Sequence, residues 1–332
     1  MKRIGLILCL ALIVVSCSKS NKINLAKERM DLVITATSID MDFKQIRYEV
    51  EILANGILKL YENQNSILPT INTNKYEVAT NGVMFKPVDD GGSAVFVSGY
   101  YPVNDEIKKV VYFTEPIDKE LRRISGKYDE VSQSYYNDKN CYNRIYPYFD
   151  VLSQYEAGMN IPEYNFYLLA DVQHNPQRKS LWVNEPYVDP AGRGWMVSAI
   201  APVYFKNELV GVPGIDVTIN QITKRYIMEN PASMTMIIDN KGNIVTAQDG
   251  TINLLSFPPL FDHKYIETIK QDTYRKENYN LLLSRDMKVR KIAIEILKNN
   301  KDVVESEING EDITVISERI AELNWYILEI FR

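Results

Sequence analysis

The sequence predicts an α+β protein with a long N-terminal helix followed by two units of antiparallel sheet. Apolar residues recur at spacings of four and three from Ile39 to Leu60, which is the pattern of one buried helix face. The stretch from Trp182 to Asn220 is rich in β-branched and aromatic residues and is divided by short polar turns, which is typical of an antiparallel meander. Hairpin signatures at 235–247 and 303–318 predict a second sheet.

Residues 1–16 have the pattern of a signal peptide. Lys2 and Arg3 precede an apolar run, Ile4 to Val15, which is too short to span a bilayer as a helix. The sequence Val14-Val15-Ser16-Cys17 resembles a lipobox, so we expect Cys17 to become the acylated N-terminus of a lipoprotein, carrying diacylglycerol and palmitate. An ordinary secretory signal is the alternative. Because two or more acyl chains hold a protein firmly on a membrane, the expected location is the cell envelope, on the periplasmic face or at the cell surface.

Composition limits the classes of partner. The formal net charge of −5 becomes −7 when Lys2 and Arg3 are removed with the signal, and this acidity argues against nucleic acid as a partner. Cys9 lies in the signal and Cys17 is the predicted lipid site, which leaves Cys141 as a single thiol. One cysteine forms neither an intramolecular disulfide nor a zinc cage, and we expect Cys141 to be a small buried apolar residue.

A tether and a long helix are predicted over residues 17–70. The apolar stripe extends back through Leu32 and Ala36, and the polar run 63–66 followed by Pro69 ends the helix. Two structures fit this stripe. The helix could self-associate as a coiled coil, or it could pack on a sheet.

Short strands and turns follow. Residues 76–87, 94–101 and 128–136 are predicted strands, and 105–123 is predicted to be partly helical. Residues 162–171 and 221–228 are predicted short helices, and the lobe boundary is placed at 229/230, before Pro231. In the second lobe, helices are predicted at 265–272 and 288–298, and a last strand at 325–331.

The central stretch resembles a known family of sensors. Its motifs are Trp-x-x-x-Pro-Tyr-x-Asp from Trp182, then Gly-Trp-Met-Val-Ser-Ala-Ile-Ala-Pro-Val-Tyr from Gly194, then Leu-Val-Gly-Val-Pro-Gly-Ile-Asp-Val from Leu209. This succession is similar to the membrane-distal half of a double Cache (dCache) domain, an extracytoplasmic ligand-binding module of bacterial chemoreceptors, kinases and cyclases. The resemblance implies a long helix lying along two PAS-like lobes, a membrane-distal ligand-binding lobe at 71–229 and a membrane-proximal lobe at 230–332.

The sequence contains no motif typical of an enzyme. Its two histidines, His174 and His263, lie in loop-like contexts without metal-ligand spacing. It has neither a Gly-x-Ser-x-Gly elbow nor a phosphate-binding glycine loop. We therefore expect a protein that is not an enzyme and has no cofactor or metal. The alternative is a hydrolase with two carboxylates, which needs no sequence motif.

Three residues of the central stretch are candidates for binding a cation. Tyr187 and Asp189 are two apart, so their side chains can lie on one side of an extended segment. The chain then makes one excursion and its return brings Asp216 back beside them. Carboxylates and aromatic rings together suit a small organic cation. The alternative is that Asp189 only caps a turn and that Asp216 only bonds backbone.

The resemblance adds further candidates. Amino-acid-binding dCache domains carry an Arg-x-Trp-Tyr element before Tyr-x-Asp and a later Asp, and in the family the acids hold the ligand ammonium group. The element falls on Tyr164-Asn165-Phe166-Tyr167, where Tyr164 replaces the arginine that would bind the ligand carboxylate. Arg144 is a rival position for that arginine. Trp182 is a further candidate ligand contact, with an anchoring role in the core as the alternative.

The resulting expectation is a lipid-anchored extracytoplasmic binding protein, either a sensor, as in chemotaxis, or an accessory that presents its ligand to a transmembrane receptor or transporter. The ammonium half of the family pattern is kept, so the predicted ligand is a small cationic or zwitterionic molecule, an amine or an amino acid. No second membrane helix precedes Arg332, so we expect that the chain does not signal across a membrane by itself. The alternative is a structural or adhesion lipoprotein with this fold and no working pocket.

Overall fold

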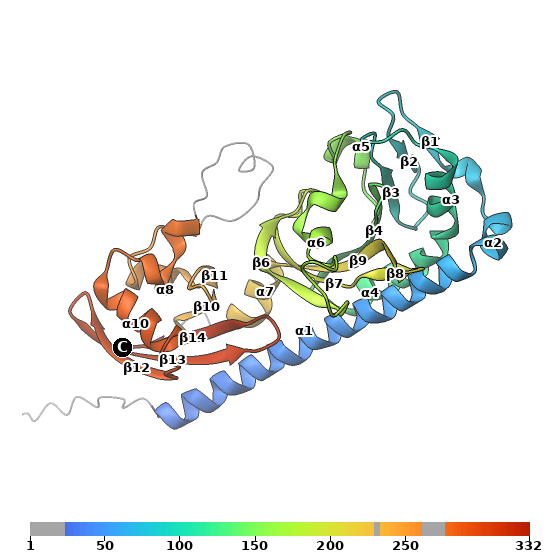
Figure 1. The fold of residues 1–332 in the computed structure, drawn as a ribbon. Coiled ribbons are helices and arrows are strands. Elements are labelled where there is room, and N and C mark those ends of the chain that lie inside the picture. Colours follow the sequence, from blue (N-terminus) through green and yellow to red (C-terminus); the bar gives the residue numbers. More distant parts are fainter. Residues whose placement is uncertain (1–23, 229–232, 261–275) are drawn as a thin grey trace, which may run out of the picture.

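The computed structural model describes residues 24–228, 233–260 and 276–332. One long helix lies along two antiparallel sheets (Figure 1), which confirms the predicted fold class. The predicted signal peptide, Cys17, His263 and the helix expected at 265–272 lie outside the described residues. So does the predicted lobe boundary at 229/230, which stays a prediction.

Helix α1 (Leu25–Glu62) has 38 residues, which corresponds to a length of about 57 Å. It begins after Asn24, whose side chain accepts a hydrogen bond from the Lys27 amide at 3.3 Å. The apolar stripe from Leu32 through Ile57 is buried, and it packs against both sheets. Of the two structures that fitted the stripe, packing on a sheet is therefore the one observed. Among the helices that the structure describes, none is both long and apolar enough to cross a membrane.

The larger sheet contains nine strands within the described residues, in the order β1-β2-β3-β5-β4-β9-β7-β6, with β8 paired to β9. Its strands are β1 (Glu77–Val78), β2 (Met84–Phe85), β3 (Ala94–Val97), β4 (Val131–Asp138), β5 (Tyr142–Tyr146), β6 (Leu181–Val188), β7 (Trp195–Ile200), β8 (Val203–Phe205) and β9 (Glu208–Thr218). The predicted meander is the β6-β7-β9 part of this sheet. The strand expected over 76–87 is wrong in its extent, because a turn at 79–82 divides it into two short strands, β1 and β2, which pair with each other.

The smaller sheet has the order β11-β10-β14-β13-β12. Its strands are β10 (Thr235–Asp239), β11 (Ile244–Ala247), β12 (Val303–Ile308), β13 (Glu311–Ile320) and β14 (Trp325–Phe331). Both predicted hairpins are confirmed. In the second, Asn309 and Gly310 have φ values of 55° and 83°, as a two-residue turn of the type favoured in hairpins requires.

Shorter helices cover the faces of the two sheets. They are α2 (Gln64–Ile67), α3 (Asp105–Phe113), α4 (Asp118–Lys127), α5 (Val151–Gln154), α6 (Asn165–Leu168), α7 (Ile219–Ile222), α8 (Asp249–Leu254) and α10 (Met287–Leu297). Helix α7 continues as a π-helical turn, Thr223–Ile227, so the helix expected over 221–228 is regular for only part of its length.

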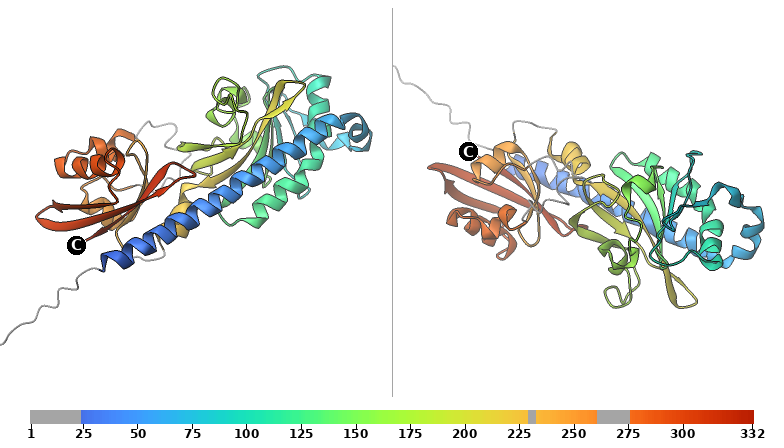
Figure 2. Two further views of the ribbon diagram at one scale, coloured as in Figure 1. Left: turned by 60° about the horizontal axis from the view of Figure 1, so that its bottom comes forward. Right: turned by 90° about the horizontal axis from the view of Figure 1, so that it is seen from above.

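The two faces of the larger sheet have different partners. Helices α1, α3 and α4 cover one face, whereas the segment that carries α5 and α6 covers the other (Figure 2). Strand β4 shows the division clearly, because alternate residues point to opposite faces. Tyr136 packs in the core with α1, whereas Tyr135 packs with Phe166 of α6. The candidate site lies on the α6 face.

Candidate ligand-binding site

Two buried carboxylates meet on the α6 face of the larger sheet. Asp216 lies in the middle of the sheet on β9, paired with Gln133 of β4 on one side and with Ser198 of β7 on the other. Asp189 follows β6 directly. The Gln133 amide joins the two acids, since its Nε2 donates to Asp216 Oδ2 at 2.6 Å and to Asp189 Oδ1 at 3.3 Å. Asp189 is 3% exposed and Asp216 is 1% exposed.

Asp189 also organises the turn between β6 and β7. Its carboxylate accepts hydrogen bonds from the Ala191 amide at 3.0 Å and from the Arg193 amide at 3.1 Å. This is the turn-capping role that the sequence left open as an alternative. The side chain nevertheless also lines a cavity, so capping and a place in the candidate site occur together.

Asp216 is held by a short relay of hydroxyl groups. Ser198 Oγ donates to Asp216 Oδ1 at 2.5 Å, and the Tyr187 hydroxyl lies 2.6 Å from the same Ser198 oxygen. With Ser198 donating to the carboxylate, Tyr187 is the donor to Ser198. The relay fixes the orientation of both Tyr187 and Asp216.

The acid pair lacks a bonded cation. Within the described residues, no Lys or Arg side chain forms an ion pair with either carboxylate. The nearby Arg193 guanidinium lowers the pKa of both acids, but its Nη1 bonds the Ser132 carbonyl at 2.8 Å. Burial, and after it the repulsion from Asp189, raises the pKa of Asp216 to about 7. Burial likewise raises the pKa of Asp189 above its ordinary value. The site therefore favours any group that brings positive charge.

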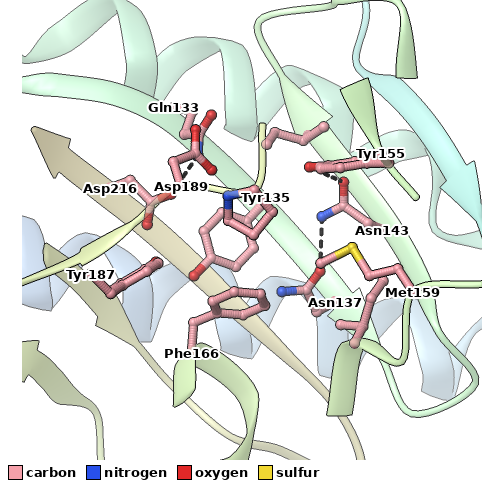
Figure 3. Close-up of a pocket in the computed structure, with 13 residues that line it drawn as sticks. Gln133, Tyr135, Asn137, Asn143, Tyr155, Met159, Phe166, Tyr187, Asp189 and Asp216 are labelled. Carbon is pink, nitrogen blue, oxygen red and sulfur yellow. Dashed lines mark hydrogen bonds between the residues drawn. The ribbon is translucent and has the colours of Figure 1, made fainter. Parts of the chain in front are cut away.

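Aromatic and amide side chains complete the cavity around the acids (Figure 3). Its wall consists of Gln133, Tyr135, Asn137, Asn143, Ile145, Tyr155, Met159, Ile161, Phe166, Tyr187, Asp189, Pro190 and Asp216. The cavity volume is about 20 Å³, enough for a single water molecule, and the atom-free space including the opening is about 340 Å³. A larger guest requires the wall to move, and the unbranched side chain of Met159 is suited to that.

Two polar atoms on this wall lack a partner of good hydrogen-bond geometry among the described residues. They are Gln133 Oε1 and the Tyr135 hydroxyl, and both are buried. Buried polar atoms without a partner carry a desolvation cost. Tyr135 reaches this position because its ring lies across Gly214 of β9, where a Cβ atom would be 2.2 Å from Tyr135 Cζ. The glycine thus makes room for the floor of the cavity.

The structure brings together some of the predicted residues and separates others. Phe166, Tyr187, Asp189 and Asp216 line one cavity. Tyr164 is 37% exposed and stacks on Phe166 without lining the cavity, and Tyr167 is buried in the core beside it.

Trp182 and Arg144 lie on the other face of the sheet. The Trp182 ring packs against Phe43 of α1 with centroids 5.0 Å apart, which is the anchoring alternative for this residue. Arg144 is fully buried, and its Nη1 is 2.9 Å from Asp118 Oδ1. Arg144 is therefore wrong as a rival partner for a ligand carboxylate in this cavity. For Trp182 the sequence contained a signal of this position. Trp182 lies an odd number of residues before Tyr187, and side chains an odd number of positions apart on a strand point to opposite faces.

Sequence reasoning missed the contributions of β4 and β5. Gln133, Tyr135 and Asn137 occupy alternate positions of β4 and share the cavity face with Asn143 of β5. The signal that could have found them is this period-two row of polar and aromatic residues in a predicted strand. Because this row of residues lies far from Asp216 in the sequence, the sequence alone did not indicate that they share a cavity.

No group of three or more His, Cys, Asp or Glu residues within the described part of the chain could hold a metal ion.

Comparisons with known proteins bear on the fold. No protein-family model matches the chain. The ligand-binding domain of the Pseudomonas fluorescens chemoreceptor CtaA, in complex with L-alanine, matches with a TM-score of 0.50 and 16% identity, over 92% of this chain and 95% of that one. The ligand-binding domain of the Pseudomonas aeruginosa PAO1 chemoreceptor PctC, in complex with GABA, matches with a TM-score of 0.50 and 13% identity, over 92% and 98%.

The extracellular domain of the histidine kinase mmHK1S-Z3 matches with a TM-score of 0.50 and 12% identity, over 93% of this chain and 94% of that one. These likenesses extend over both sheets and the long helix, and at such identities they concern the fold alone. The fold of this chain is therefore that of a double Cache (dCache) sensor domain, as found in the ligand-binding regions of chemoreceptors and histidine kinases.

Proposed function

We propose that this chain is an extracytoplasmic, lipid-anchored binding protein that takes a small amine or amino acid into the cavity beside β4 and β9. The observation that carries the proposal is the pair Asp189 and Asp216, both buried and joined by Gln133, with no bonded basic side chain in the described structure. The nearby Arg193 guanidinium lowers the pKa of both acids but bonds neither carboxylate, and burying two carboxylates without a direct ionic partner is costly. A cationic guest supplies that partner, and Gln133 Oε1 offers it a further acceptor.

The aromatic residues of the wall support the same class of ligand. Tyr135, Phe166 and Tyr187 lie around the acid pair, and aromatic rings attract cations while they exclude water. CtaA and PctC, which share the fold, were solved with L-alanine and GABA, and both of these compounds carry an ammonium group. The proposed acylation at Cys17 would hold the binding domain at a membrane, where it could act as a sensor or present its ligand to a transmembrane receptor or transporter.

A ligand-dependent shift in thermal stability tests the proposal. Amines and amino acids are added to the purified wild-type protein and to Asp216→Asn. A ligand at a hundred times its dissociation constant adds about 2.7 kcal/mol to the free energy of unfolding. We expect that shift for the wild type and none for Asp216→Asn. The matched control is Asp138→Asn, which changes another buried acid on the opposite face of the sheet and should keep the full shift.

The small size of the cavity favours one competing function. Its volume of about 20 Å³ suits a structural or adhesion lipoprotein that has this fold without a working pocket. That alternative predicts no stabilisation by any cationic compound, and a shift that survives in Asp216→Asn would also contradict our proposal.

A further inference from the structure

The cavity has a second polar end that is chemically different from the acid pair. Gln133, Tyr135 and Asn137 follow one another at alternate positions on β4, so their side chains share the cavity face. Gln133 lies at the acid end. Asn137 lies at the other end of the row, directly opposite Asn143 of β5 (Figure 3).

Asn137 presents a hydrogen-bond donor at this second end. Its Oδ1 already accepts from Asn143 Nδ2 at 2.8 Å, and Asn143 Oδ1 accepts from the Tyr155 hydroxyl at 3.4 Å. The Asn137 Nδ2 group makes no hydrogen bond within the described residues, although the residue is only 2% exposed. Figure 3 shows this nitrogen directed away from Asn143, toward the middle of the cavity. A partner for it must be a hydrogen-bond acceptor.

The second end carries no charge. The cavity wall, as far as the structure describes it, includes neither Lys nor Arg, and the neighbouring Arg144 points to the opposite face, where it pairs with Asp118. A ligand carboxylate at Asn137 would be buried without a counter-charge, which is costly. A neutral carbonyl oxygen has no such cost and satisfies the same donor.

The spacing of the two ends limits the length of the ligand. Gln133 and Asn137 are four residues apart, which corresponds to about 13 Å along a strand. Because side chains stand roughly perpendicular to a sheet, hydrogen bonds of about 3 Å to them shorten this span by between nothing and about 6 Å, which leaves roughly 7 to 13 Å between the ligand atoms. The ammonium and carboxylate groups of an α-amino acid are both attached to its α-carbon. They are therefore much too close together to reach both ends of the cavity.

We propose that the ligand is an elongated amine with a neutral carbonyl or carboxamide oxygen at its far end, held between Asp189–Asp216 and Asn137. This inference rests on the proposed function, because it assumes a cation at the acid pair. It assigns Asn137 as the residue that determines specificity at the other end. Met159 and Ile161, which line the same cavity, are the residues that must shift to admit the chain of the ligand.

Isothermal titration with a matched series of ligands tests this specificity. The probes are hexylamine, ε-aminocaproamide and ε-aminocaproate, which share an amine and a carbon chain and differ at the far end. We expect the amide to bind up to about tenfold more tightly than hexylamine, because it adds a hydrogen bond to Asn137 Nδ2. We expect the carboxylate to bind more weakly than the amide. Equal affinities for hexylamine and the amide would overturn the inference.

Two substitutions at Asn137 separate a role in specificity from a role in folding. Asn137→Leu removes the donor, so in this variant the amide should lose its advantage over hexylamine. Asn137→Asp keeps the acceptor for Asn143 Nδ2 but adds a carboxylate, so it should shift the preference to hexamethylenediamine. The gain in diamine binding depends on the introduced negative charge facing the ligand. It would not occur if Asn137 had a role in folding alone.

The outcomes distinguish the two proposals. If hexylamine binds the wild type and loses affinity in Asp216→Asn, but the amide shows no advantage and Asn137→Asp gains no diamine binding, the far-end assignment is wrong and the proposed function stands. If neither an amine nor an amino acid binds the wild type, both proposals are wrong.

Discussion

Asp216 is the residue at which stability and ligand binding are expected to oppose each other. Its carboxyl group is buried in the middle of a sheet beside a second acid, and its pKa is about 7, well above the ordinary value of about 3.9. Between these two pH values the folded protein keeps a proton that the unfolded chain has released. The free energy of unfolding therefore falls as the pH rises through this range, and the full loss is present above pH 7.

Replacing Asp216 by Asn should make the protein more stable at high pH. The introduced amide keeps an acceptor for Ser198, and the Gln133 amide can turn its unpartnered Oε1 toward the new donor. We expect urea denaturation at pH 8 to show a higher free energy of unfolding for Asp216→Asn than for the wild type, with little difference at pH 4. The control is Asp105→Asn on the surface of α3, where the side chain is 89% exposed. A variant that is less stable than the wild type at both pH values would contradict this account.

The same carboxyl group predicts the pH dependence of binding. A primary amine stays charged throughout, since its pKa is near 10.4, like that of lysine. Asp216 is neutral below pH 7 and must lose its proton to face a cation. The affinity for hexylamine should therefore rise with pH up to about 7, by up to about tenfold per pH unit, and then level off. Titrations at pH 5.5 and 8 measure this, and equal affinities at both would contradict the assignment.

At the scale of elements, the contact between β4 and β9 forms the floor of the cavity. The Tyr135 ring can lie flat only because Gly214, its partner across the two strands, has no side chain. Gly211, which is paired with Asp138, makes room in a similar way for the Tyr136 ring on the opposite face, where a Cβ atom would be 2.4 Å from that ring. Gly214 thus makes room for a ring on the cavity face of the sheet, and Gly211 makes room for a ring in the core with α1.

Gly214→Ala should abolish binding and weaken the fold. The added methyl group would displace the Tyr135 ring into the cavity, and overpacking of this kind costs about 1 to 3 kcal/mol. The control is Gly56→Ala on α1, where no atom lies within 4 Å of the new Cβ and the helix should gain up to about 1 kcal/mol. Urea denaturation and amine titration of both variants check this. Normal binding by Gly214→Ala would show that Tyr135 does not shape the site.

At the scale of the whole molecule, β6 connects the candidate site to the smaller sheet. One end of β6 leads into Tyr187 and Asp189. Toward its other end, Asn184 Nδ2 donates to the Leu323 carbonyl at 2.8 Å, and Trp325 Nε1 donates to the Asn184 carbonyl at 3.0 Å. Trp182 Nε1 also donates to Glu322 Oε1 at 3.2 Å. A change at the acid pair therefore has a direct route, along one strand, to the turn between β13 and β14.

We expect ligand binding to protect this turn from hydrogen exchange. The amides of residues 321–325 should exchange more slowly when an amine occupies the cavity, because β6 is then held more rigidly against them. Asn184→Ala removes one connecting hydrogen bond, worth about 1 kcal/mol, and should reduce the protection without abolishing binding. The control is Glu185→Gln, which breaks an exposed ion pair with Lys241 and should have little effect. Protection that is unchanged in Asn184→Ala would exclude this route.

The amino-acid sequence was enough to predict the long helix, the meander, both hairpins of the smaller sheet and the closeness of the two acids. These features depend on local patterns: the spacing of apolar residues, the Asn309-Gly310 turn, and a chain excursion that returns Asp216 toward Asp189. Strand pairing between neighbours in the sequence is a short-range property, so the sequence alone could predict it.

The other residues that share the cavity could be identified only from the folded chain. Strand β4 enters the sheet between β5 and β9, and that order brings Gln133 to Asp216 although the two residues are far apart in the chain. It also sends Arg144 and Trp182 to the α1 face, away from the acids. Pairing between distant strands depends on how whole faces are buried against α1 and α6. No local pattern encodes it, and the polar lining of the cavity therefore became visible only in the folded chain.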